Sequence, residues 1–188
     1  MACVVSHKYK FIFIHVPRTG GTAFLSPFSP YWGLLGKKDY IPEWHERFEF
    51  FKNKFPKAWK TYFKFAFVRN PLDRMVSMWL IKRRQDEPFI DFMESIKSNP
   101  SREPFCRPQS YWIGNGSQLD YVARFENHSR ETAYLAGRAG LPLIHLDKVR
   151  ITPGKLHYAD YYGQDALKIA SSLCKQDMEN FNYGQGNN

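Results

Sequence analysis

Hydrophobic residues in this chain form short continuous runs that alternate with longer amphipathic segments. The runs at residues 10–16 (KFIFIHV) and 62–68 (YFKFAFV) are rich in aromatic and β-branched residues, which is typical of buried strands. Residues 121–125 and 143–149 are two further candidate strands. The helix-like segments lie at residues 43–54, 89–98, 129–139 and 164–180. This alternation predicts an α/β fold in which helices flank a central, mainly parallel sheet.

Both long runs end in a turn that leads into a helix. The first ends at Pro17 and is followed by RTGGT, after which a helix is expected from about residue 20. The second ends in the tripeptide RNP, where Asn70 is a good helix cap and Pro71 a good first helical residue. A helix is therefore predicted over residues 72–83.

The length of 188 residues suits one domain over residues 1–188, with a polar end at 181–188 that is expected to fray. Residues 99–118 hold three prolines and two glycines and are expected to form an irregular loop. No apolar run approaches the roughly 18–20 residues of a membrane span, and the N-terminus lacks the pattern of a signal peptide. We therefore expect a soluble, cytoplasmic protein with no membrane span.

The cysteines and the net charge indicate what kind of environment and what kind of ligand the protein has. Cys3, Cys106 and Cys174 are odd in number and lack the spacing of metal ligands, so we expect reduced, buried side chains. The formal net charge of +9 predicts an anionic ligand. Nucleic acid, an anionic surface and a phosphorylated cofactor or substrate all satisfy that charge.

The turn after the first strand has the composition of an anion site. Gly20 and Gly21 permit close approach of the backbone, Arg18 adds a planar cation, and Thr19 and Thr22 carry hydroxyl donors. The alternative is an ordinary glycine turn between a strand and a helix. A nucleotide triphosphatase loop would read GxxxxGK[ST], and Gly21 stands where its lysine would be, which argues against ATP or GTP.

The turn after the second strand places a cation where metal-dependent nucleotide hydrolases commonly have an aspartate. Arg69 there suits a phosphate bound through two hydrogen bonds, so no metal ion is expected, and Ser77 is a further donor. The alternatives are a surface ion pair of Arg69 with Asp73 and a solvated helix face for Arg74. Two anion sites at neighbouring strand ends indicate a nucleoside with phosphates at both ends.

Together, HVPRTGGT and FKFAFVRNPLDRMVSMW resemble sulfotransferases that use 3′-phosphoadenosine 5′-phosphosulfate (PAPS), particularly the carbohydrate sulfotransferase branch. RPQSYWI, YVARFEN and HYADYYGQDALKIASSLCKQDMENFNY are similar to the same branch, so the resemblance covers nearly the whole chain in order. It implies a P-loop-like three-layer fold, PAPS as the donor and adenosine 3′,5′-bisphosphate as the product, with no metal ion.

The resemblance also implies roles for individual residues. Residues 19–22 (Thr19, Gly20, Gly21 and Thr22) would hold the 5′-phosphosulfate, and Arg69 with Ser77 the 3′-phosphate. The carbohydrate branch usually has lysine where this chain has Arg18. Because arginine does not release its proton, we expect Arg18 to act as an electrostatic clamp on the leaving phosphate and not as an acid.

The implied reaction is in-line attack on sulfur by a hydroxyl or amine of a carbohydrate-like acceptor, and it needs a general base. His45 is the candidate, because imidazole titrates near neutral pH, and Glu43 and Glu46 are second choices. The alternative for His45 is an ordinary histidine on a helix surface. His15, inside the first strand, is expected to be a packed core residue.

Several basic and aromatic residues are weaker candidates. The lysines and aromatic residues interleaved over 51–64 are expected to be a solvated helix with an apolar inner face, and the alternative is a rim that attracts an anionic acceptor. Lys155 is a candidate contact to the donor from a late loop. In the loop at 99–118, four side chains are candidates for covering the donor or stacking on an acceptor sugar, namely Arg102, Arg107, Tyr111 and Trp112.

Two other functions compete with sulfuryl transfer. A small P-loop-like nucleotide kinase is disfavoured by the missing lysine and by Arg69 at the strand end. A non-enzymatic nucleic-acid-binding protein would use the positive charge and the aromatic residues, although we expect no nucleic-acid partner. The acceptor's identity and the oligomeric state stay open.

Overall fold

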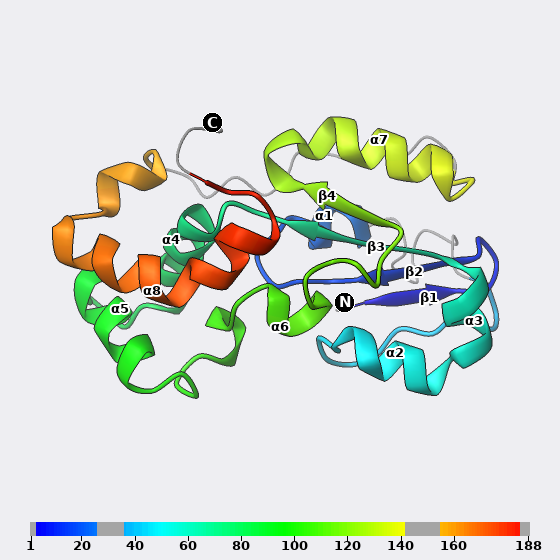
Figure 1. Cartoon of the computed structure of the whole chain (residues 1–188), viewed down its shortest axis with the longest axis horizontal. Helices are drawn as coiled ribbons and strands as arrows, with labels where there is room; N and C mark the ends of the chain where they lie inside the picture. Colours follow the sequence, from blue (N-terminus) through cyan, green and yellow to red (C-terminus); the bar gives the residue numbers. More distant parts are fainter. Residues whose placement is uncertain (1–2, 26–35, 142–154, 185–188) are drawn as a thin grey trace.

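The computed structural model describes residues 3–25, 36–141 and 155–184, which form a mixed α/β structure around a mainly parallel sheet (Figure 1). Within these ranges the sheet order is β1-β2-β3-β4, and the strands are Val4–Ser6, Phe11–Ile14, Phe63–Val68 and Tyr121–Arg124. β2, β3 and β4 are parallel, whereas β1 is antiparallel to β2. The predicted strand at 143–149 lies outside the described residues.

Helices cover both faces of the sheet because alternate residues of each strand point to opposite faces. Phe11, Phe13, Phe65 and Phe67 pack against α1 (Gly21–Leu25) and α7 (His128–Arg138). The residues between them pack against helices on the other face, which are α2 (Phe48–Lys54), α3 (Pro56–Thr61) and α6 (Ser110–Ile113). Figure 1 shows α7 on one side of the sheet and α2, α3 and α6 on the other.

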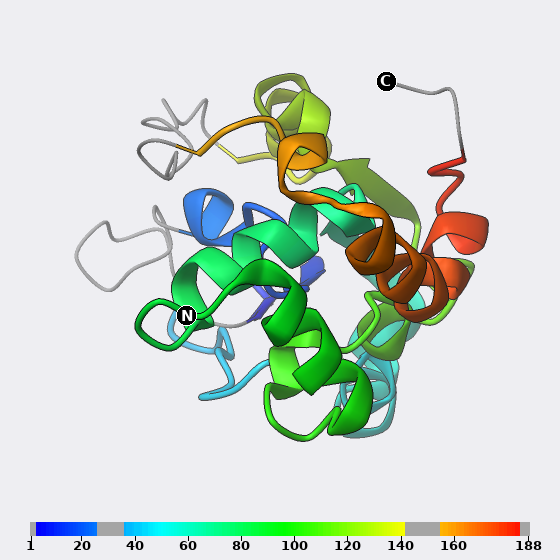
Figure 2. The ribbon, with the colours of Figure 1, turned by 90° about the vertical axis from the view of Figure 1, so that its left-hand side faces the viewer.

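A third apolar cluster lies beyond the carboxyl ends of the strands. It joins α4 (Pro71–Lys82), α5 (Phe89–Ser98) and α8 (Gln164–Asn180), and it includes Val76, Phe92 and Ile169. The view along the sheet in Figure 2 shows these three helices together in front of the strands. None of the helices in the described ranges has the length and apolar character needed to cross a membrane.

Most predicted elements are confirmed within a residue or two, but two predictions were wrong and one strand was not predicted. The helix expected from residue 43 begins at Phe48, because a bridge from Tyr40 to Val5 holds the preceding segment along the sheet. The loop 99–118 is less irregular than expected, since it contains the 3₁₀ turn Pro104–Cys106 and α6. β1 was not predicted, because three residues are too few for a strand pattern.

The C-terminal residues that we expected to fray are partly core residues. Phe181 and Tyr183 are buried in the cluster that covers the α2 and α6 face of the sheet. Two aromatic side chains bury enough apolar surface to hold this segment against the domain. The three cysteines are reduced and buried, as predicted.

Candidate functional site

Parallel pairing places the carboxyl ends of β2, β3 and β4 at one edge of the sheet, and the two predicted motifs meet there. Arg69 Nη1 donates to the carbonyl of Arg18 at 3.2 Å. The guanidinium of Arg18 donates to Ser77 Oγ through Nε at 3.1 Å and Nη2 at 2.8 Å. The guanidinium of Arg69 also lies over the ring of Phe125, with 4.2 Å to its centroid. The fold therefore brings both motifs into one site.

An ion-pair cluster lies in the same place. Asp73 Oδ2 pairs with Arg69 Nη2 at 2.6 Å, and Asp73 Oδ1 pairs with Lys155. Burial lowers the pKa of Lys155, and the hydrogen bond that Lys155 donates to Asp73 opposes that shift. The alternative interpretation of Arg69 was a surface ion pair with Asp73. The ion pair exists, but it is not at the surface, because Arg69 is only 7% exposed. A partly desolvated cluster of this kind favours an anion more than an exposed one does.

The backbone of the glycine turn is anchored by its carbonyl groups. Four of the five carbonyl groups from Val16 to Gly20 accept a hydrogen bond from a side chain of the described residues. The donor and acceptor pairs are Thr19 Oγ1 with Val16 (2.8 Å), Arg74 Nε with Pro17 (2.9 Å), Arg69 Nη1 with Arg18 (3.2 Å) and His128 Nε2 with Gly20 (3.1 Å).

This anchoring sets the direction of the backbone N–H groups. A trans peptide group is planar, so each N–H points opposite to the carbonyl of the preceding residue. The N–H groups of Arg18, Thr19 and Gly21 therefore point away from the anchoring donors. In each of these three peptides the N–H group and the anchored carbonyl oxygen face opposite ways, and backbone N–H groups fixed in this manner are a feature of anion sites. Arg18 adopts a φ of +66°, which these bonds hold in place.

Arg74 is a scaffold residue of this site and not the solvated side chain of the alternative interpretation. It is 2% exposed and donates to three carbonyl groups. One belongs to Pro17, and the others belong to Arg107 and Phe105, at 3.0 and 2.6 Å. A single buried guanidinium thus ties the glycine turn to the loop that precedes α6, because its donors diverge from one planar group.

Gly21 leaves no room for a side chain. A Cβ there would lie 2.6 Å from His15 Nε2 and 2.9 Å from Phe13 Cζ, and both rings are buried. We expect Gly21→Ala to reduce the free energy of unfolding by about 1–3 kcal/mol through overpacking. Gly137→Ala is the control, because a Cβ in that helix meets nothing within 4 Å and alanine is the better helix former. Urea denaturation of both variants checks this, and equal stabilities would contradict it.

The carboxyl end of β3 is fixed by a residue that the sequence did not single out. The buried amide of Gln109 donates to Arg69 O at 2.8 Å and accepts from Arg69 N at 2.9 Å. Asp177 in turn accepts from the backbone N–H groups of Gln109 and Ser110 at 2.5 and 2.8 Å. The loop itself held other candidates, but Gln109 was included only through the RPQSYWI resemblance, since nothing local marks a glutamine 40 residues away as a partner of Arg69.

His45 lies beside the end of β2, ahead of α2 and not on a helix surface. Its Nδ1 is 2.7 Å from the carbonyl oxygen of His15, and the two rings are 4.6 Å apart. A carbonyl only accepts, so Nδ1 carries the proton and Nε2 keeps its lone pair. Burial lowers the pKa of His45, which favours the neutral ring with an unprotonated Nε2. The rings of Phe105 and Trp112 flank the His45 ring, with centroid separations of 5.2 and 5.9 Å.

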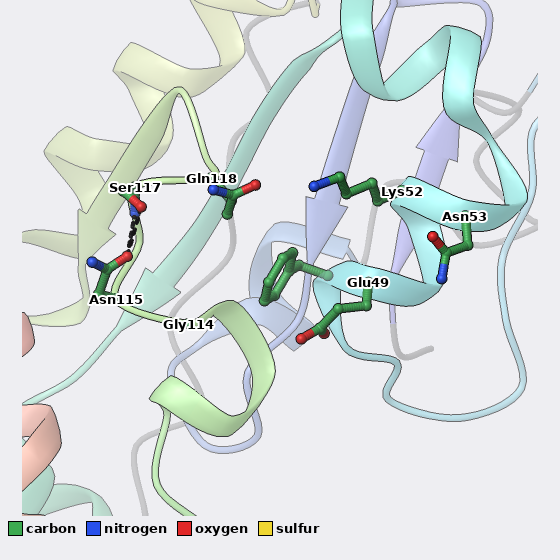
Figure 3. Close-up of a pocket in the computed structure, with 8 residues that line it drawn as sticks. Glu49, Lys52, Asn53, Gly114, Asn115, Ser117 and Gln118 are labelled. Atoms are coloured by element: carbon green, nitrogen blue, oxygen red, sulfur yellow. Dashed lines mark hydrogen bonds between the residues drawn. The ribbon is translucent and has the colours of Figure 1, made fainter.

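A pocket of about 490 Å³ opens between α2 and the loop that follows α6. In Figure 3, Glu49, Lys52 and Asn53 of α2 lie across it from Asn115, Ser117 and Gln118. Phe48 completes the lining and packs against Gly114. The pocket is thus rich in amide and hydroxyl groups, with an aromatic ring at one wall.

Of the remaining predicted site residues, some lie at the carboxyl edge of the sheet and others lie elsewhere in the chain. Thr19 is buried and its hydroxyl donates to the carbonyl of Val16, whereas Thr22 is exposed. Arg102 ion-pairs with Glu87 at 2.7 Å, so it holds its own loop to the connection between α4 and α5. The lysines of α2 and α3 are exposed over an apolar inner face, as predicted. Within the described ranges, no three His, Cys, Asp or Glu side chains are grouped to hold a metal ion.

Comparison with known proteins agrees with the two motifs. The model of the sulfotransferase family matches residues 1–145, which include both motifs, His45 and β4. No significant match was found among curated proteins or solved structures. Since the matched region is more than half of the chain and contains the whole described sheet, the chain belongs to the sulfotransferase family.

Proposed function

We propose that this protein transfers a sulfuryl group from PAPS to a hydroxyl or amine of a carbohydrate-like acceptor. The observation that carries the proposal is the junction of the two motifs, where Arg69 donates to the backbone of Arg18 and Arg18 donates to Ser77. One ligand with an anionic group at each end of a nucleoside accounts for both halves of such a site. The family match supports sulfuryl transfer in general.

The residues at the site fit PAPS. The glycine turn directs its N–H groups away from its anchored carbonyls and lacks room for side chains, which suits the 5′-phosphosulfate. Arg69, Ser77 and Lys155 suit the 3′-phosphate. The turn between a parallel strand and a helix also fits a P-loop-like three-layer fold, with helices on both faces of the sheet.

The chain's own residues supply orientation, charge and a base. PAPS, when bound, supplies the sulfuryl group and leaves as adenosine 3′,5′-bisphosphate. Arg18 and the N–H groups of the turn stabilise the negative charge that develops on the leaving phosphate, an effect usually worth about 2.7–4 kcal/mol per donor. His45 accepts the proton of the attacking hydroxyl at Nε2, while its Nδ1 bond to His15 keeps the ring in that tautomer.

The pocket beside α2 supports a carbohydrate-like acceptor. Phe48, which lines it, follows His45 by three residues, and the loop opposite follows Trp112, whose ring flanks His45. The same two segments thus carry the proposed base and the pocket. Amide, hydroxyl and carboxylate groups pair with the hydroxyls of a sugar, and an aromatic wall suits its apolar face. A screen of saccharides with radiolabelled PAPS tests the acceptor class.

Titration calorimetry with adenosine 3′,5′-bisphosphate tests the donor. We expect binding that is unchanged by EDTA and weaker for adenosine 5′-monophosphate, because the latter lacks the phosphate placed at Arg69. Binding of ATP that requires Mg²⁺ would instead indicate a kinase. Steeply salt-dependent oligonucleotide binding without mononucleotide affinity would indicate a nucleic-acid-binding protein.

A further inference from the structure

His128 is a buried histidine that belongs to neither motif, yet it contacts the glycine turn. It begins α7, is 5% exposed, and stacks on Phe67 of β3 with ring centroids 4.9 Å apart. Its second aromatic neighbour is Phe125, edge-on at 5.9 Å. These contacts fix the plane of the imidazole and aim Nε2 at the carbonyl of Gly20, 3.1 Å away.

The hydrogen bond defines both the tautomer and the direction of the peptide. The carbonyl of Gly20 only accepts, so Nε2 of His128 carries the proton. Burial lowers the pKa of His128, so the ring stays neutral near pH 7. The same carbonyl accepts from the N–H of Ala23 at 3.0 Å, so two donors hold it on the side away from the N–H of Gly21.

The packing explains why this turn needs glycine next to the histidine. Gly20 has a φ of +83°, and a Cβ there would lie 2.8 Å from Cδ2 of both His128 and Phe125. The two rings therefore press directly on the backbone of the turn. His128 is the only one of the four carbonyl anchors in the described residues that comes from outside the two motifs.

We infer that His128 is a positioning residue for the 5′-phosphosulfate turn, acting through the Gly20 carbonyl and not through contact with the donor. The inference rests on the proposed function. Without the bond, only the N–H of Ala23 holds this carbonyl, so the 20–21 peptide is less firmly fixed and its carbonyl oxygen can turn part of the way toward the anion. Because a neutral hydrogen bond contributes about 1 kcal/mol, His128→Phe should weaken adenosine 3′,5′-bisphosphate binding roughly 5- to 10-fold.

Two variants and two ligands separate positioning from general destabilisation. His128→Phe keeps the stacking on Phe67 but removes the donor, whereas His128→Gln supplies an amide N–H and should restore most of the affinity. The loss should occur for adenosine 3′,5′-bisphosphate and be absent for adenosine 3′-monophosphate, which has no group at the turn. His7→Phe is the matched control. His7 bonds to Tyr62 at the amino ends of β2 and β3, which is the end of the sheet opposite to the glycine turn.

The outcomes distinguish this inference from the proposed function. If the unaltered protein binds neither nucleotide, the proposed function fails. If it binds the bisphosphate and His128→Phe binds equally well, the inference is overturned. Equal losses for both ligands, or equal losses in His128→Phe and His128→Gln, would also overturn it, since they indicate a loosened fold.

Discussion

Replacing Arg69 with alanine is expected to reduce the affinity for adenosine 3′,5′-bisphosphate by about 100-fold, because each hydrogen bond between a guanidinium and a phosphate contributes roughly 1.5–3 kcal/mol. Arg69 is nearly buried, so little solvent screens its charge. The substitution also removes one anchor of the turn, the bond to the Arg18 carbonyl. Calorimetric titration below the melting temperature of the variant measures the loss.

The fold should survive this change, because Asp73 keeps its pair with Lys155 and Gln109 still binds the backbone of residue 69. Arg69→Lys keeps the charge but not the planar pair of donors, so we expect it to recover only part of the affinity. Lys168→Ala is the surface control, since its ion pair with Asp165 is exposed. Wild-type affinity in Arg69→Ala would exclude this strand end as the 3′-phosphate site.

Replacing His45 with asparagine is expected to lower kcat by about 10²–10⁴ and to leave the affinity for adenosine 3′,5′-bisphosphate almost unchanged. The asparagine amide can still donate to the His15 carbonyl, so the local structure keeps its anchor, but the basic nitrogen is gone. Transfer from radiolabelled PAPS to a saccharide found in the acceptor screen measures kcat. Unchanged turnover would remove His45 from the mechanism.

The pH dependence of the same reaction is a separate prediction. A general base works in its neutral form, so the rate should fall as the pH drops through the pKa of His45. Burial lowers that pKa, so the acidic limb should lie below the pH at which an ordinary histidine titrates. An acidic limb above pH 7 would contradict the assignment of the base to this buried ring.

The local pattern of hydrophobic and polar residues was sufficient to predict most of the strands and helices. The runs FIFI and FKFAFV correspond to β2 and β3, and they are apolar on both faces except at Lys64. The Asn70 side chain caps α4 by accepting from the N–H of Leu72 at 2.9 Å. The start of α2 was misplaced because two contacts distant in sequence, the bridge of Tyr40 with Val5 and the bond of His45 to His15, compete with helix formation there. Such competition leaves no mark in a short window of sequence.

The prediction of anion-binding chemistry for the two motifs likewise came from short stretches, since a strand end, a glycine turn and a helix cap are all local signals. The anchoring of those motifs was not. Arg74 reaches Pro17 across 57 residues, and His128 reaches Gly20 across 108 residues. Partners so far apart meet only after the parallel strands pair, because that pairing alone brings the strand ends and the start of α7 to a common edge. Residue types therefore indicated an anion site, and tertiary packing alone decided which way its backbone faces.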